Sequence, residues 1–204
     1  MKLYFAPFAC SLSPHIALRE AGLSFELARV DLRTKKTSDG EDYTAINPKG
    51  YVPALKLDNG DVLSEGPAIV QYIADLRPEA GLAPARDSFA RYRLQEWLNF
   101  ISTELHKQFS PLFSPTLPAP QREQAIKKVK RRLAHVEEQL KAQAFLLGEQ
   151  LSVADIYLFT VLRWTRTVRL DITEFTRVTE YLARIAGRPA VVAALAYESE
   201  AKGK

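Results

Sequence analysis

The sequence changes character near residue 80, and this change limits the folds that the chain can adopt. Before it, short apolar strands alternate with helical segments in the order β-α-β, a polar crossover, then β-β-α. After it, apolar residues recur at helical spacing, and the expected helices are residues 88–109, 121–143, 152–168, 176–186 and 190–197. We therefore expect an α/β domain over residues 1–80 and an all-helical domain over residues 85–204.

Turn and capping residues divide the first 80 residues into a small mixed sheet with two helices. Pro14 stands at the first position of an expected helix, so Ser13 is expected to be its N-cap and Gly22 its end. The Asp-Asn-Gly run at residues 58–60 predicts a hairpin, and the polar residues 33–47 are expected to form a crossover. The expected strands are residues 2–5, 25–30, 52–57 and 62–63.

The only cysteine, Cys10, stands between the first expected strand and the first expected helix. Backbone N–H groups at a helix N-terminus lack intrahelical partners, and together with the helix dipole they stabilise an anion such as a thiolate. Cys10 is therefore a candidate nucleophile. A lone cysteine is also commonly a small buried apolar residue, and position alone leaves both interpretations open.

Composition excludes several classes of function. One cysteine allows no internal disulfide, and the first residues lack the apolar run of a signal peptide, so we expect a cytoplasmic protein. No stretch approaches the ~20 apolar residues that cross a bilayer. The basic run at residues 127–132 is interleaved with apolar residues at helical spacing, which favours a solvated helix face over nucleic-acid binding. The three histidines are far apart in sequence, so no metal site is expected.

Ser152 and Asp155 have the spacing of a capping box at the start of an expected helix. Asp155 lies among apolar residues and could be mistaken for a catalytic acid. Because its position matches the geometry of a cap, we expect a structural role.

Four features, in this order along the chain, resemble the cytosolic glutathione transferases, most closely the bacterial beta class. They are the strand-Cys10-helix opening, the Val52-Pro53 pair before a strand, the Glu65-Gly66-Pro67 turn into a helix, and the capping box at residues 152–155. The resemblance extends from residue 1 to about residue 197. It implies a thioredoxin-like first domain that binds glutathione as co-substrate, and an all-helical second domain that forms an apolar substrate pocket. It further implies a homodimer with a role in detoxification.

The resemblance also assigns glutathione contacts in the first domain. Pro53 would be the cis-proline of a thioredoxin-like fold, with the Val52 backbone paired to the cysteinyl part of glutathione; the residues alone also allow an ordinary strand-edge proline. Glu65 and Gly66 would hold the γ-glutamyl group, although many relatives carry serine where this chain has Gly66. The remaining implied contacts are Ser11, and Lys35 for the glycyl carboxylate.

Further candidates lie on the expected helix at residues 88–109. Asn99, Ser102, Thr103 and His106 are three or four residues apart and would share a face. From the residues alone, a histidine beside a lysine on a helix surface most often faces solvent. The resemblance implies instead that His106 and Lys107 lie beside the glutathione sulfur, while Asn99 and Glu104 approach the site of the dimer partner. Candidates for the apolar lining are Phe8, Phe109, Phe113 and Trp164.

The resemblance leaves two chemistries and one different class of function open. The glutathione thiolate can attack an electrophile or a peroxide, or Cys10 can form a mixed disulfide with glutathione. In the second case Ser13 occupies the position of a resolving cysteine, so a second glutathione has to resolve the adduct. Tyr4 and Ser11 are alternative hydroxyl groups for holding the sulfur. A non-enzymatic interaction module of the same fold is the alternative function. The sequence does not identify the electrophile.

Overall fold

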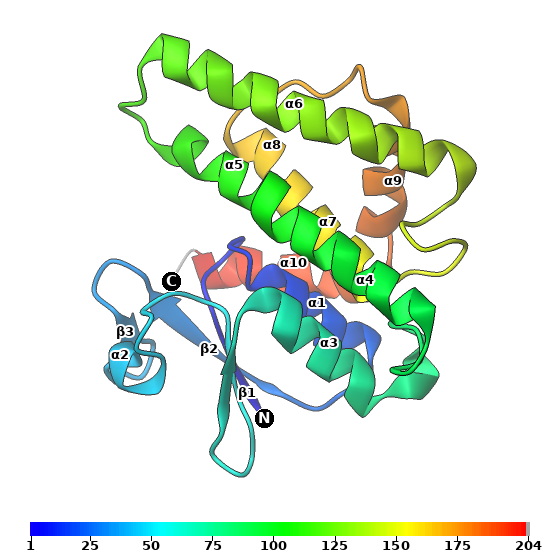
Figure 1. Ribbon diagram of the computed structural model, residues 1–204. Coiled ribbons are helices and arrows are strands. Elements are labelled where there is room, and N and C mark those ends of the chain that lie inside the picture. Colours follow the sequence, from blue (N-terminus) through cyan, green and yellow to red (C-terminus); the bar gives the residue numbers. More distant parts are fainter. Residues whose placement is uncertain (203–204) are drawn as a thin grey trace. The chain divides into compact units, whose positions relative to one another are not determined.

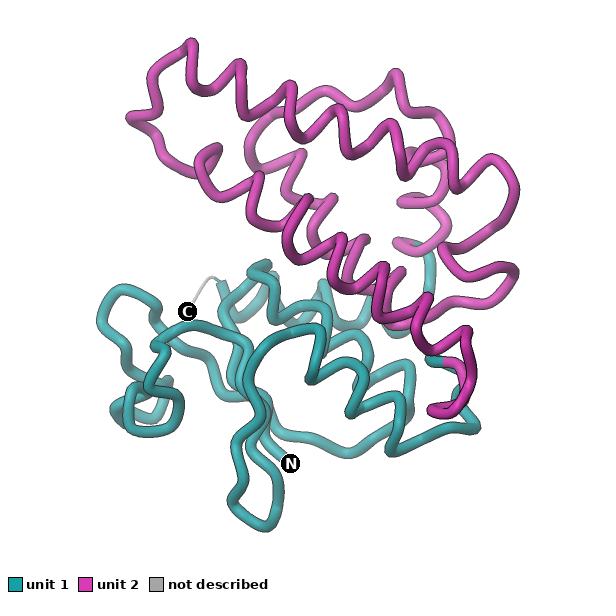
Figure 2. The backbone as a smooth tube through the Cα atoms, in the orientation of Figure 1, with its two compact units in different colours: residues 1–83, 187–204 teal, residues 84–186 magenta. Residues whose placement is uncertain are grey.

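The computed structural model describes residues 1–202, which form two compact units (Figure 2). Unit 1 comprises residues 1–83 together with the described residues from 187 onward, and unit 2 comprises residues 84–186. The boundary between the units, at residues 83 and 84, lies close to that of the expected domains 1–80 and 85–204, but the last helix is grouped differently. The last helix, α10 (Pro189–Lys202), groups with unit 1 because it packs against α1 (Leu12–Glu20) (Figure 1).

Unit 1 is built on a five-stranded mixed sheet with the strand order β3-β2-β1-β4-β5. The central strand β1 pairs parallel with β2 and antiparallel with β4, and β5 pairs antiparallel with β4 through the predicted hairpin. Helix α1 packs against both α3 (Gly66–Leu76) and α10. The strands are β1 (Lys2–Phe5), β2 (Glu26–Asp31), β3 (Lys36–Thr37), β4 (Ala54–Lys56) and β5 (Val62–Ser64). This βαβ-ββα order confirms the expected thioredoxin-like class.

The crossover and the start of α1 differ from the sequence-based prediction. The crossover contains the short strand β3 and the helix α2 (Tyr43–Ile46). The fully buried Tyr43 anchors this helix, and its ring packs at a tilt against that of Tyr4 with centroids 5.5 Å apart. The expected N-cap at Ser13 is wrong, because helical turns begin earlier and the N-cap is Ser11. The Ser13 hydroxyl instead donates to the Cys10 carbonyl oxygen at 3.0 Å.

Unit 2 is helical, as expected, but two of its predicted helices consist of more than one element. The predicted helix 88–109 is continuous in space and consists of α4 (Phe89–Phe100), the π-helical turn η2 (Ile101–His106) and α5 (Lys107–Phe109). The predicted helix 152–168 divides into α7 (Val153–Leu162) and α8 (Trp164–Thr167). The other elements are η3 (Ser110–Phe113), α6 (Ala119–Ala142) and α9 (Thr176–Ala186). A short turn of unit 1, η1 (Pro78–Ala80), precedes unit 2.

Helix α7 is the centre of unit 2, because each of its ten residues is buried. Its start confirms the structural role predicted for Asp155, which is fully buried and completes the capping box with Ser152. The carboxylate accepts from the backbone N–H groups of Leu146 and Ser152, both at 2.8 Å. It also accepts from the hydroxyl groups of Ser152 at 2.6 Å and of Tyr181 at 3.0 Å. Asp155 therefore ties the loop before α7 and the helix α9 to the start of α7.

Two absences among residues 1–202 bear on function. None of the helices in this range is long and apolar enough to span a membrane. Within the same range, no three His, Cys, Asp or Glu side chains gather in a way that could hold a metal ion.

Candidate active site

Cys10 lies half-buried in the loop that connects β1 to α1. Its thiol Sγ is 3.3 Å from the carbonyl oxygen of Val52, to which it donates a hydrogen bond. The peptide bond between Val52 and Pro53 is cis, as the resemblance implies. Two residues that are 42 positions apart in sequence, and that were both candidates for glutathione binding, are thus brought into contact.

The hydroxyl groups proposed as alternatives to Cys10 are part of the core. The Ser11 side chain is fully buried, and its Oγ lies 3.2 Å from both the backbone nitrogen and the carbonyl oxygen of Ala6. Tyr4 is 3% exposed, and burial raises its pKa. A sulfur held by either hydroxyl would need the core to open. Ser11 is placed to support the loop that carries Cys10.

A buried polar network, which sequence reasoning missed, holds the same loop from the C-terminal helix. His15 Nδ1 lies 3.0 Å from Glu198 Oε1, and both side chains are fully buried. Arg19 Nε donates to His15 Nε2 at 2.9 Å. Because arginine only donates, Nε2 must accept and His15 carries its proton on Nδ1, from which it donates to Glu198.

The other oxygen of Glu198 reaches the loop itself. Oε2 accepts from the backbone N–H of Phe8 at 2.6 Å, two residues before Cys10. Phe8 has a φ of 60°, in the left-handed region that few L-residues adopt. Glu198 therefore holds the Cys10 loop in an otherwise unfavourable conformation. Its partner His15 is 183 residues away in sequence, so no local pattern could have revealed it.

Glu65 stands at the start of α3 with a φ of 71° and an exposed side chain. Its Oε1 accepts from Lys49 Nζ at 2.6 Å and from the Tyr51 hydroxyl at 2.7 Å. The hydrogen bond to Glu65 is the main reason that the pKa of both Lys49 and Tyr51 is raised. Glu65 thus presents a carboxylate that already attracts a cation, as binding of an ammonium group requires.

Gly66 follows Glu65 and is buried. A Cβ at this position would lie 3.9 Å from Ser13 Oγ and 4.0 Å from Pro53 Cγ, which are ordinary van der Waals distances. A Cβ would therefore fit here, and the glycine is not required by steric crowding at that atom.

Lys35 is half-buried with a φ of 58°, and its Nζ donates to the Gly50 carbonyl oxygen at 2.7 Å. The segment of residues 49–53 therefore contacts several candidate residues of unit 1. Its Gly50 accepts from Lys35, its Tyr51 and Lys49 bind Glu65, and its Val52 accepts from Cys10. Unit 1 assembles these candidates around one stretch of backbone.

In unit 2, His106 ends the π-helical turn η2 and is half-buried. Its Nδ1 lies 2.7 Å from the hydroxyl oxygen of Tyr157, and its ring packs against Trp164 with centroids 4.8 Å apart. Trp164 also contacts Phe109 at 5.9 Å and Phe113 at 5.4 Å between centroids. Three of the four residues predicted to line an apolar pocket therefore form one aromatic cluster beside His106. The fourth, Phe8, belongs to unit 1.

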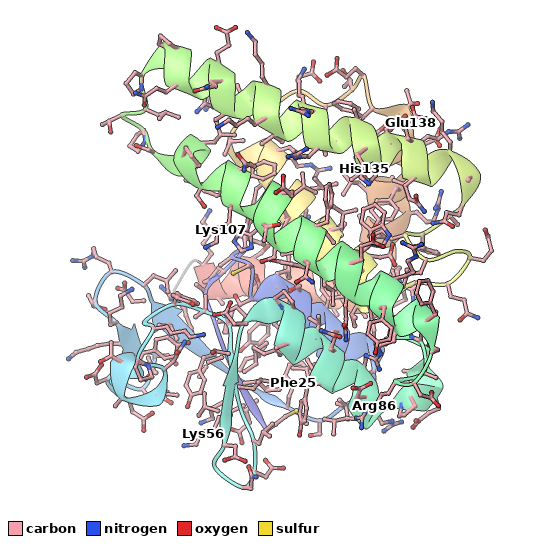
Figure 3. The ribbon with its side chains drawn as sticks, viewed as in Figure 1. Phe25, Lys56, Arg86, Lys107, His135 and Glu138 are labelled. Carbon is pink, nitrogen blue, oxygen red and sulfur yellow. The ribbon has the colours of Figure 1, made fainter. Side chains whose placement is uncertain are left out.

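The remaining candidates of this helix are distributed over its surface. Lys107 is exposed and follows His106 directly (Figure 3). Asn99 is exposed, and its carbonyl oxygen accepts from the Thr103 hydroxyl at 3.0 Å. Glu104, expected near the partner's site, forms an ion pair with Arg132 of the same chain. Because a π-helix has more residues per turn than an α-helix, the face expected from a spacing of three or four residues does not continue through η2.

A surface cavity of about 620 Å³ lies elsewhere in unit 2, between α4, α6 and the loop after α6. Trp97, Phe100 and His135 are packed together in its wall, and His135 is labelled on α6 in Figure 3. None of the candidate residues named above lines this cavity.

Comparisons with known proteins agree with this architecture. The family model described as the glutathione S-transferase N-terminal domain matches residues 9–76, and the one described as the C-terminal domain matches residues 100–189. Glutathione S-transferase GstA of Escherichia coli O157:H7 is 46% identical over 97% of this chain and 98% of its own length.

Two solved structures are similar over nearly the whole chain. A sphingomonad glutathione S-transferase complexed with glutathione is 48% identical with a TM-score of 0.94, covering 98% of this chain and 99% of that one. The bacterial beta class glutathione S-transferase of Sphingomonas chungbukensis is 46% identical with a TM-score of 0.93, and the match covers 97% of this chain and 98% of that one. These matches do not support the alternative of a non-enzymatic interaction module. By sequence and by fold, the chain belongs to the glutathione S-transferase family, close to its bacterial beta class.

Proposed function

We propose that this enzyme conjugates reduced glutathione to small, mostly apolar electrophiles, and that Cys10 adds a peroxidase or thiol-transferase side activity. The observation that carries the proposal is the arrangement in unit 1, where the Cys10 thiol, the Val52 backbone, Lys35 and Glu65 are linked through residues 49–53. Each group complements one part of the tripeptide. The solved sphingomonad relative, complexed with glutathione, supports the same ligand.

The roles follow from the chemistry of each group. The backbone of Val52 pairs with the cysteinyl residue, Glu65 and the Gly66 N–H take the γ-glutamyl ammonium and carboxylate, and Lys35 takes the glycyl carboxylate. We further propose that His106 and Lys107 stabilise the glutathione thiolate, with Ser11 supporting the Cys10 loop. The aromatic cluster around Trp164 supplies apolar contacts for the second substrate.

Both chemistries balance with glutathione and one further substrate, an electrophile for conjugation or a disulfide for thiol transfer. In conjugation, the thiolate forms a carbon–sulfur bond to the electrophile while the leaving group departs with the electron pair of the broken bond. In thiol transfer, the Cys10 thiolate attacks the glutathione sulfur of a mixed disulfide between glutathione and a substrate thiol, forming the Cys10–glutathione disulfide and releasing the substrate thiolate. A second glutathione thiolate then attacks the adduct, regenerating the Cys10 thiolate and forming oxidised glutathione.

A homodimer, to which Asn99 and Glu104 contribute across the interface, and a cytoplasmic location complete the proposal. Sedimentation equilibrium of the purified chain tests the dimer. The wild-type chain is expected to sediment at twice the monomer mass, and a monomer at micromolar concentration would contradict this part.

The decisive test of the proposed function is the intact mass of the protein after incubation with oxidised glutathione, paired with conjugation of an aromatic halide. Wild type is expected to gain the mass of one glutathione, and Cys10→Ala to gain none, because Cys10 is the only thiol in the chain. Turnover of the aromatic halide by wild type is expected as well. A folded protein with neither adduct nor turnover would contradict the proposal, whereas turnover without an adduct would remove only the thiol-transfer arm.

Glu65→Gln is expected to raise the KM for glutathione about tenfold, because an amide cannot pair with the ammonium group as a carboxylate does. Steady-state conjugation over a range of glutathione concentrations measures this. Glu26→Gln is the matched control, since Glu26 is an exposed carboxylate of the same unit that also pairs with a lysine, Lys2, at 3.3 Å. An equal KM in the two variants would rule out Glu65 as the ammonium ligand.

A further inference from the structure

Tyr157 has no role in the function proposed above, yet it contacts a residue that does. It lies on the buried helix α7, is 2% exposed, and places its hydroxyl oxygen 2.7 Å from His106 Nδ1. The contact joins residues 51 positions apart in sequence. It is formed where the π-helical turn η2 ends, and π-helical turns are frequent at functional sites.

Which nitrogen of His106 carries the proton depends on whether the Tyr157 hydroxyl donates or accepts in this contact. A phenol is protonated at neutral pH, and a buried phenol donates its proton to an acceptor within reach. When Tyr157 donates to Nδ1, that nitrogen must be unprotonated, and the single proton of the neutral ring is on Nε2. His15 shows the opposite case in the same chain, because Arg19 donates to its Nε2 and so places its proton on Nδ1.

The His106 ring is also held in orientation. Trp164 packs against it edge-on, with an angle of 69° between the ring planes and centroids 4.8 Å apart. The Tyr157 ring also packs edge-on against the His106 ring, with centroids 5.9 Å apart and an angle of 72° between the ring planes. Contacts from two aromatic rings and one hydrogen bond restrict rotation of the imidazole, so Nδ1 and Nε2 cannot exchange places freely.

We propose that Tyr157 is a positioning residue that holds His106 as the Nε2–H tautomer, so that neutral His106 donates an N–H to the anionic sulfur of glutathione. The donor stabilises the thiolate without transferring a proton, and His106 therefore acts without first becoming positively charged. The identity of the acceptor rests on the proposed function. The proposed tautomer rests instead on the contacts of His106 within unit 2.

Nitrogen-15 NMR of protein labelled at its histidines tests the tautomer directly, since protonated and unprotonated ring nitrogens resonate far apart. The three signals are assigned with His106→Gln and His135→Gln. In wild type, His106 is expected to be protonated on Nε2 and His15 on Nδ1. In Tyr157→Phe, His106 is expected to become a mixture of tautomers while His15 stays unchanged. A wild-type His106 protonated on Nδ1 overturns the proposal, and that measurement needs no variant that has to fold.

Conjugation kinetics test the consequence for catalysis. Tyr157→Phe is expected to lower kcat/KM at neutral pH about tenfold, with most of the loss in kcat, and to shift the pH profile toward higher pH. Tyr92→Phe, an exposed tyrosine of the same unit, is the control and is expected to match wild type. Full activity in Tyr157→Phe with impaired His106→Gln overturns the positioning role. Full activity in both Tyr157→Phe and His106→Gln would show that the proposed role of His106, and with it the proposed function of this residue, is wrong.

Discussion

Replacing Asp155 with alanine is expected to lower the free energy of unfolding by about 3–5 kcal/mol. The carboxylate is fully buried and accepts four hydrogen bonds, from Leu146, from Tyr181, and twice from Ser152. Burial raises the pKa of Asp155, and the same four donors oppose that shift. Alanine would leave these donors buried without their acceptor, and each such group costs about 1–3 kcal/mol.

Urea unfolding followed by far-UV circular dichroism measures this loss. Asp171→Ala is the matched control, because Asp171 also accepts from a backbone N–H and a hydroxyl, those of Thr173, but at the surface. For the Asp171→Ala control, the free energy of unfolding is expected to fall by less than about 1 kcal/mol. If the two variants unfold at the same urea concentration, Asp155 does not join the loop and α9 to α7 in the way described.

Replacing Glu198 with alanine is expected to lower the free energy of unfolding by about 3 kcal/mol and to slow the reaction of Cys10 with oxidised glutathione. Removing the buried Glu198 carboxylate leaves its donors, His15 Nδ1–H and the Phe8 N–H, without an acceptor, and each such buried group costs about 1–3 kcal/mol. Here the residues left behind are His15 with its donor Arg19, and the N–H of Phe8 loses its acceptor. The loop that carries Cys10 would then lose the contact that holds its left-handed residue.

Urea unfolding and the rate of mixed-disulfide formation, followed by intact mass, check the two parts of this prediction. Glu200→Ala on the same helix is the control, because Glu200 is exposed. Glu198→Gln is expected to fall between wild type and alanine, since the amide retains an oxygen that can accept from Phe8 but loses the charge. An alanine variant as stable as the Glu200 control would show that the network contributes nothing to unit 1.

Local patterns predicted most of the elements. The hairpin at residues 58–60, the capping box at Ser152 and Asp155, and the helical periodicity of unit 2 depend on residues close together in sequence, and the structure confirms them. Strand β3 and helix α2 were missed because they are only two and four residues long, too short for a period to be visible.

Features that depend on distant partners could not be predicted. The π-helical turn η2 lies within a segment whose apolar spacing predicts an ordinary amphipathic helix. Tyr157 and Glu198 form their contacts with His106 and His15 only through tertiary packing. Cys10 is the intermediate case. Its position at the end of a strand was visible in the sequence, whereas its contact with Val52 needed the folded sheet.

The grouping of α10 with unit 1 has a consequence for the order in which the chain can fold during its synthesis on the ribosome. The first 83 residues emerge early, but the carboxylate that holds their Cys10 loop is residue 198, and it leaves the exit tunnel only after all of unit 2. All residues of unit 2 have been synthesised before Glu198 emerges from the ribosome. The Cys10 loop therefore reaches its described conformation only after unit 2 has been synthesised, when α10 packs onto the sheet unit that was translated first.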